Sequence, residues 1–229
     1  LELILHPMAE DAKEATGSMG DDTPLAVLSD KYRPLYHFFR QNFSQVTNPP
    51  IDSLRENKVM SLKTRFGNLG NILDFNNLTE ENIYVLNSPI LTNNQFEKFV
   101  SFFDKNNKTI DCTFKSDEDI QTKLNSIKQE AEIYVRQGVT QIILSDKNVS
   151  KENYPVPMLL CVGAVHTHLT KMKLRGYVSI NVQTGEALDT HSFATLIGVG
   201  ATTVNPYLAL DSLYQRFEKK LFGKFLYEE

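Results

Sequence analysis

Between residue 80 and residue 229, short apolar runs alternate with longer stretches of helical period. Each apolar run is long enough for one buried strand, and each periodic stretch is long enough for one amphipathic helix. Strands are predicted at residues 83–86, 109–114, 141–144, 177–182 and 202–205, and helices at residues 94–103, 117–137, 157–172, 187–197 and 208–222. Repeated strand–helix units favour a mainly parallel sheet with helices outside it. An open doubly wound sheet and an incomplete β/α barrel both fit this pattern.

The N-terminal part, residues 1–60, has an irregular pattern of short helical pieces and loops. Residues 1–12 carry apolar side chains at helical spacing, which predicts a first helix. Residues 34–43 predict a second, amphipathic helix packed on the core. Its apolar face would consist of Leu35, Phe38, Phe39 and Phe43.

Two loops interrupt this N-terminal part. The first is rich in glycine and turn-forming acids and consists of Gly17, Ser18, Met19, Gly20, Asp21 and Asp22. The second contains Thr47, Asn48, Pro49 and Pro50. Two consecutive prolines remove two backbone donors and push Asn48 out of the helical region, so this loop is predicted to be rigid and extended. Asp52 can then cap the next short helix.

We expect one domain over residues 1–229, with the helical and loop part at residues 1–60 and the repeated β/α units at residues 80–229. The intervening stretch, residues 57–107, is rich in asparagine and poor in pattern, with Gly67 and Gly70 in a predicted turn.

Composition narrows the class of protein. The 229 residues are 41% hydrophobic and 10% aromatic, which suits a well-packed domain, and the formal net charge of -4 is spread along the chain. No basic stripe is present for nucleic acid. The richest apolar run, residues 158–165, is too short for a membrane span, and the N-terminus does not read as a signal peptide. A cytoplasmic or stromal location is therefore expected, and the start at Leu1 within a helical pattern suggests a fragment of a longer chain.

Several side chains invite a chemical role, but each has a simpler interpretation. His166 and His168 are two positions apart on a predicted helix and would point in nearly opposite directions, so neither they nor His191 predict a metal site. Asp146 follows a strand, where barrel enzymes hold catalytic groups, but an aspartate there more often caps a turn.

Two further motifs receive a structural interpretation. Gly198 and Gly200 resemble half of a dinucleotide motif, but they follow a helix and precede a strand, which is the wrong order, and they are predicted to end the helix. Cys112 and Cys161 lie among apolar neighbours and are interpreted as buried hydrophobic residues. No activated serine or cysteine is recognisable. From the residues alone, the chain is an α/β domain without a visible active site.

Ordered blocks along the whole chain resemble one family. They are residues 17–29, 45–52, 144–146, 162–166, 184–187 and 200–209, with sequences such as Gln45-Val46-Thr47-Asn48-Pro49-Pro50-Ile51-Asp52 and Val162-Gly163-Ala164-Val165-His166. In this order they are similar to the central region of the glutamate synthase large subunit. Only the asparagine-rich stretch matches weakly.

The resemblance implies a non-catalytic domain shaped as a rudimentary, incomplete TIM-like β/α barrel. In such an enzyme, an N-terminal glutaminase domain releases ammonia, which travels through a tunnel to a C-terminal FMN domain with an iron–sulfur cluster. There 2-oxoglutarate becomes glutamate, so that glutamine and 2-oxoglutarate yield two glutamates. A β-helix domain and a small NADPH-oxidising subunit or ferredoxin would be further partners. This fragment itself would hold no cofactor, and Pro206 has no backbone N–H for a flavin phosphate.

The resemblance also implies roles for the two loops. The loop with Thr47, Asn48, Pro49 and Pro50 would border the ammonia tunnel, although the same rigidity would suit a structural turn. The loop from Gly17 to Asp22 would contact a neighbouring domain. Thr167 and Ser192 stand where the family leads us to expect histidine, and Lys147 stands where we expect arginine. The alternative is an independent barrel-like enzyme or flavin-binding protein.

Overall fold

The computed structural model describes residues 1–14, 28–40, 52–67, 73 and 83–223. At its centre lies a parallel sheet with the order β3 (Asn107–Asp111), β5 (Gln141–Ser145), β7 (Ser179–Gln183) and β8 (Thr203–Asn205). Strands that are consecutive in this series are direct neighbours, with Ile143 opposite Asn181 and Asn181 opposite Thr203. An isolated parallel bridge joins Ile90 to Val204 beside β8. The mixed α/β class with a mainly parallel sheet is thus confirmed.

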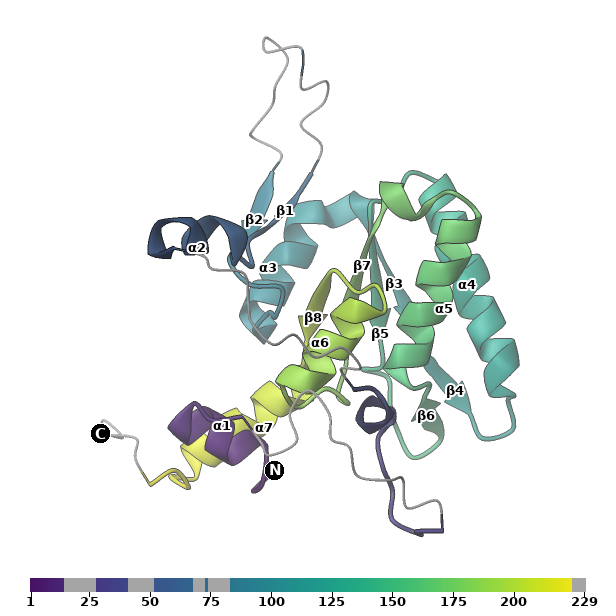
Figure 1. Ribbon diagram of the computed structural model, residues 1–229. Coiled ribbons are helices and arrows are strands. Elements are labelled where there is room, and N and C mark those ends of the chain that lie inside the picture. The colour runs from purple at the N-terminus through teal and green to yellow at the C-terminus, as the bar shows by residue number, and fades with distance from the viewer. Residues whose placement is uncertain (15–27, 41–51, 68–72, 74–82, 224–229) are drawn as a thin grey trace.

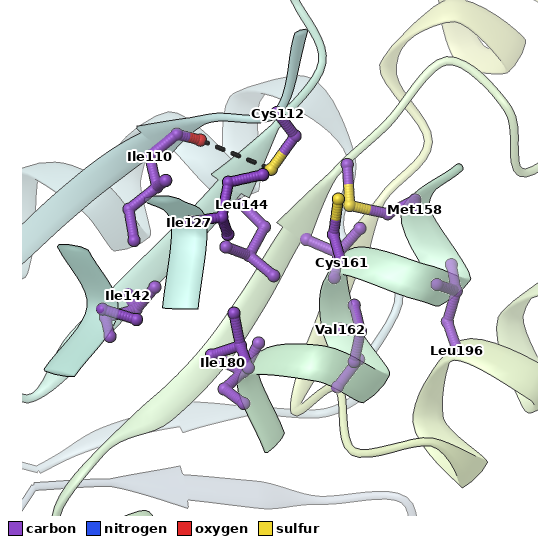
Figure 2. Close-up of a cluster of buried hydrophobic side chains, with 14 of the residues drawn as sticks. Ile110, Cys112, Ile127, Ile142, Leu144, Met158, Cys161, Val162, Ile180 and Leu196 are labelled. Atoms are coloured by element: carbon purple, nitrogen blue, oxygen red, sulfur yellow. Dashed lines mark hydrogen bonds between the residues drawn. The ribbon is translucent and has the colours of Figure 1, made fainter. Parts of the chain in front are cut away.

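Three helices cover one face of this sheet: α4 (Ile120–Arg136), α5 (Met158–Lys171) and α6 (Thr190–Gly198) (Figure 1). Local chemistry fixes where two of them begin, because Asp119 accepts a hydrogen bond from the Thr122 backbone and Asp189 accepts one from Ser192. The main core lies between these helices and the apolar face of the strands. Figure 2 shows Ile142, Leu144 and Ile180 from the sheet beside residues of α5.

The opposite face of the sheet packs against α3 (Asn93–Phe103) through Ile143 and a cluster of aromatic rings. Phe99 is fully buried, and its ring lies 5.0 Å from that of Phe66 and 5.0 Å from that of Phe103. An antiparallel ribbon of β1 (Thr64–Phe66) and β2 (Tyr84–Leu86) completes this second core. A capping box between Thr92 and Gln95 starts α3.

Smaller elements surround this centre. At one side of the molecule, α1 (Leu5–Asp11) packs along α7 (Tyr207–Glu218) (Figure 1). Asp52 accepts hydrogen bonds from the first turn of α2 (Ser53–Val59), as the sequence predicted. Further short elements are the 3₁₀ turns η1 (Leu35–Phe38), η3 (Asp104–Asn106) and η4 (Arg175–Tyr177), and the strands β4 (Thr113–Lys115) and β6 (Asn153–Pro155). Among the helices of the described part, none is long and apolar enough to cross a membrane.

The amphipathic helix predicted at residues 34–43 is wrong within the described residues. Only η1 forms there, and the chain is extended at Phe39. A 3₁₀ turn buries one side chain rather than a stripe, and that side chain is Tyr36, which is 2% exposed, whereas Phe38 is 50% exposed. Tyr36, which carries a hydroxyl group, therefore packs in the core in place of the predicted helix face of leucine and phenylalanine side chains.

The single strand predicted at residues 109–114 is also wrong, because two strands occupy this stretch. The Asp111 carboxylate accepts hydrogen bonds from the backbone N–H and the hydroxyl of Thr113, at 2.9 and 2.8 Å. This local turn competes with the ladder and ends β3. β4 then leaves the main sheet and pairs antiparallel with β6.

Candidate functional site at the carboxyl ends of the strands

A row of polar side chains runs across the carboxyl ends of the parallel strands. The Ser145 hydroxyl donates to the Gln183 amide oxygen at 2.9 Å, and the Gln183 amide nitrogen donates to the Asn205 amide oxygen at 3.3 Å. Asn205 in turn donates to the Leu91 carbonyl and to the Asn93 amide oxygen. Because each amide is held by a neighbour, its orientation is fixed before any ligand arrives.

A second polar row lies one layer deeper on the same face. The buried Asn181 amide donates to the Gln141 side chain at 3.1 Å and to the Ile142 carbonyl, and it accepts from the Thr203 hydroxyl at 2.7 Å. Asn181 and Thr203 are completely buried. Parallel strands buried on both faces are usually apolar throughout, so two hydrogen-bonded polar rows mark this face as unusual.

A cavity of about 440 Å³ opens beside the first row, between α3 and α7. Gln183 and Asn205 line it at the strand ends, together with Lys147 from the loop that follows β5. The helices contribute Asp211 from α7 and aromatic and acidic side chains from α3. In open α/β sheets and in β/α barrels, ligands bind at this edge of the sheet. The cavity is therefore the candidate functional site.

Asp146, the candidate catalytic acid from the sequence, lies near this edge, but its carboxylate is already engaged in hydrogen bonds within the protein. It is 2% exposed and accepts hydrogen bonds from the Thr184 hydroxyl at 2.5 Å and from the Gly185 backbone at 3.0 Å. Burial raises the pKa of Asp146, and burial followed by the charge of Asp146 raises the pKa of Tyr207. Asp146 caps the turn after β7, which is the structural role that the sequence favoured.

Tyr36 ties the N-terminal part to this end of the sheet. Its backbone carbonyl lies 2.8 Å from Nε2 of His191, and its hydroxyl donates to Glu186 at 3.3 Å. Glu186 also accepts from the Met158 backbone at 3.0 Å. Burial, followed by the charge of Glu186, raises the pKa of Tyr36. Tyr36 therefore joins η1 to α6 and to the loop after β7.

The three histidines of interest have separate partners. His166 accepts from Nε of Arg175 at 3.1 Å, and His168 lies 2.6 Å from the Glu132 carboxylate, while His191 contacts Tyr36. Within the described residues, no group of three potential ligands is placed to hold a metal. Each of the three side chains therefore takes part in its own hydrogen bond.

Gly200 ends α6, as predicted. It has a φ of 125°, and the backbone N–H groups of Gly200 and Ala201 donate to the carbonyls of Ile197 and Leu196, both at 3.0 Å. This is the Schellman arrangement. A Cβ at Gly200 would lie 2.5 Å from Nδ1 of His166, and the Arg175 guanidinium donates to the Gly200 carbonyl at 2.9 Å.

Both cysteines are free and fully buried in the main core (Figure 2). The neighbouring Cys161 thiol and burial raise the pKa of Cys112, which keeps it protonated. Their interpretation as small buried residues is confirmed.

The two loops predicted to carry function lie outside the described residues. They are Gly17, Ser18, Met19, Gly20, Asp21 and Asp22, and Thr47, Asn48, Pro49 and Pro50. The structure instead brings together Gln183, Asn205 and Lys147, which sequence reasoning did not select for the site. One feature of the sequence could have pointed to this site. Polar and apolar residues alternate in β7, whereas a buried parallel strand is normally apolar throughout.

Comparison with known proteins identifies the family. The model of the glutamate synthase central domain matches residues 1–228. The chain is 56% identical over 226 residues to the glutamate synthase [NADPH] large chain of Azospirillum brasilense, with 97% of this chain and 15% of that protein covered. It is 42% identical to the corresponding large chain of Bacillus subtilis, with 96% and 14% covered. It is 40% identical to the chloroplastic ferredoxin-dependent glutamate synthase of Spinacia oleracea, with 94% and 14% covered.

This chain belongs to the glutamate synthase central domain family. It spans about one seventh of the length of these relatives.

Proposed function

We propose that this chain is the non-catalytic central domain of a glutamate synthase, which connects a glutaminase domain to an FMN-binding synthase domain and helps to form an ammonia tunnel. The match over residues 1–228 carries the proposal. The whole enzyme would convert L-glutamine and 2-oxoglutarate to two L-glutamates. Since the chain covers only 15% of the Azospirillum relative, that relative has ample length for glutaminase, FMN and β-helix domains.

The donor groups of this chain do not fit the cofactors of such an enzyme. Pro206 is the N-cap of α7, directly after β8, and proline offers no N–H to a flavin phosphate at this helix start. Among the described residues, the adjacent cavity is lined by one cation, Lys147, and by two carboxylates, Glu97 and Asp211, which would repel a phosphate. An iron–sulfur cluster requires several thiolates, whereas Cys112 and Cys161 are buried between sheet and helices. We therefore propose that both cofactors bind to other domains of the enzyme.

An incomplete TIM-like barrel is the arrangement that we propose for the β/α units. A doubly wound sheet reverses its strand order at a switch point, with helices on both faces. Here β3, β5, β7 and β8 follow one another without reversal, and the connecting helices α4, α5 and α6 share one face. Such a sequence of units forms part of a barrel wall, and the two polar rows would then lie on the interior side, which the preceding helix α3 covers in this chain. The four strands of this sheet in the described part of the chain are half of the number in a complete barrel.

The flanks of the double-proline loop support its proposed place beside the tunnel. On one side, Tyr36 is anchored to α6 through His191, and on the other side Asp52 caps α2. A stiff segment can hold backbone groups at a constriction with little loss of entropy. We propose further that the loop from Gly17 to Asp22 contacts a neighbouring domain. We also propose a cytoplasmic or stromal location, of which the stromal alternative agrees with the name of the spinach relative, which is chloroplastic.

The electron donor varies among the relatives, whose names include NADPH-dependent and ferredoxin-dependent enzymes. We propose that a small NADPH-oxidising subunit or ferredoxin acts on another domain of the enzyme, because the central domain matches both groups over more than 90% of this chain.

Two measurements test the proposal. For the isolated 229-residue chain, we expect no ammonia release from L-glutamine and no quenching of FMN fluorescence. Ammonia release would reject the non-catalytic role, and saturable quenching would favour an independent flavin-binding protein.

The tunnel requires the full-length enzyme. In the Pro49→Gly, Pro50→Gly double variant, the loop gains flexibility, and ammonia should escape to solvent. Glutamine consumed per 2-oxoglutarate converted should then rise above the wild-type ratio, while Pro155→Gly in the peripheral strand β6 should leave the ratio unchanged. An unchanged ratio in the double variant would reject the tunnel role of this loop.

A further inference from the structure

The cavity between α3 and α7 combines opposite charges that are not paired with each other. Lys147 stands at the strand ends, Asp211 belongs to α7, and Glu97 belongs to α3. Within the described part of the chain, no ion pair joins Lys147 to either carboxylate. A cavity with one cationic wall and two anionic walls suits a small ligand that carries both charges.

The floor of the cavity offers hydrogen-bond donors in fixed directions. The Gln183 amide nitrogen uses one hydrogen for Asn205, and its oxygen is occupied by Ser145, so one N–H remains. Asn205 is 1% exposed and lines the cavity with all of its amide groups engaged, which holds Gln183 in place. The remaining Gln183 N–H and the Lys147 ammonium lie at neighbouring strand ends, because Asp146 donates its backbone N–H to the Gln183 carbonyl at 3.2 Å.

The helix side of the cavity offers acceptors. The Asn93 amide donates to Oδ1 of Asp211 at 2.8 Å, which holds this carboxylate in position and leaves Oδ2 for another donor. Glu97, one turn further along α3, adds a second carboxylate. The Phe96 ring lies beside them and supplies apolar surface for a methylene chain. The volume of about 440 Å³ lies in the range of small-molecule sites.

We propose that this cavity binds a free α-amino acid with a polar side chain. Lys147 and the free N–H of Gln183 would bind the α-carboxylate, and Asp211 and Glu97 would bind the α-ammonium group. The second hydrogen of the Asn93 amide would serve a side-chain carbonyl. A phosphate-bearing ligand does not fit, since the charged lining is net negative. This site is separate from the tunnel and linker roles proposed above and does not depend on them.

The test is an NMR titration of the isotope-labelled 229-residue chain with L-glutamine, which has both backbone charges and a side-chain carbonyl. We expect saturable shifts at the side-chain amides of Gln183, Asn205 and Asn93. N-acetyl-L-glutamine lacks the ammonium group and should bind at least about tenfold more weakly, equivalent to about 1.4 kcal/mol. The Asp211→Asn variant should lose the same preference.

Matched lysine variants distinguish the loss of the Lys147 charge from a general effect on folding. Lys147→Met should weaken binding about tenfold or more, whereas Lys151→Met, on the same loop but outside the cavity lining, should bind as the wild type does. Thermal unfolding of each variant checks that it is folded. Absence of saturable shifts up to the solubility limit of L-glutamine would overturn the proposal, and so would equal binding of the N-acetyl compound.

Discussion

Gly200 offers the sharpest test of how α6 ends. Its φ of 125° is rarely adopted by residues with a Cβ, and forcing such a residue into this conformation costs about 1–3 kcal/mol. A Cβ there would also lie 2.5 Å from Nδ1 of His166, the atom that accepts from Arg175. Displacing this ring loses a hydrogen bond to a charged group, which is worth about 1.5–3 kcal/mol. We therefore expect Gly200→Ala to lower the free energy of unfolding by about 2.5–6 kcal/mol.

Substitutions at two other glycines separate the cost of the backbone conformation from the cost of the contact with His166. Gly138 has a φ of 91° and no atom within 4 Å of an added Cβ, so Gly138→Ala should incur the backbone cost of about 1–3 kcal/mol alone. Gly163 lies inside α5 with free space around it, and Gly163→Ala should stabilise the domain by about 0.5–1 kcal/mol.

Urea unfolding followed by circular dichroism gives the three free energies of unfolding. Thermal scans should show the same order, at about 2–4 °C per kcal/mol for a domain of this size. If Gly200→Ala unfolds at the same urea concentration as Gly138→Ala, the contact with His166 adds nothing, and the reasoning about the hydrogen bond between Arg175 and His166 is refuted.

Three further predictions concern the polar groups near the candidate site. Asn181→Ala leaves Gln141 and Thr203 without their buried partner and should cost about 2–4 kcal/mol in urea unfolding, whereas a cost below about 1 kcal/mol would mean that the row is not structural. Tyr36→Phe removes only a hydroxyl and should cost about 1 kcal/mol, while Tyr36→Ala should cost about 3–5 kcal/mol and speed proteolysis of the N-terminal part; equal effects would contradict the anchor. Burial raises the pKa of Asp146, so its contribution to stability is present below about pH 4 and is lost as pH rises through the raised pKa. The stability of the wild type relative to Asp146→Asn should therefore fall from pH 4 to pH 7, and a flat difference would show that the carboxyl is not perturbed.

Much of the β/α part was predictable because its signals are local. Strands such as Gln141–Ser145 and helices such as Met158–Lys171 were located within a few residues. The caps at Asp52 and Gly200 were also predictable, since a helix end depends on a few neighbouring residues. The secondary-structure predictions were wrong at two places where a single side chain or a short turn determines the local structure. At Asp111 a local hydrogen bond ended the strand, and at Tyr36 a short turn replaced a helix.

The class of fold, the family and the structural roles of the two cysteines and of Gly200 were accessible from the sequence, because they follow from periodicity, local spacing and ordered motifs. The set of residues that forms the cavity, in contrast, depends on the three-dimensional arrangement of the elements. Lys147, Gln183, Asn205 and Asp211 come from separate elements, and they meet because parallel strands end at the same edge of the sheet and α7 begins directly beyond β8. Contacts across such sequence distances depend on strand order and helix packing, which local patterns do not specify.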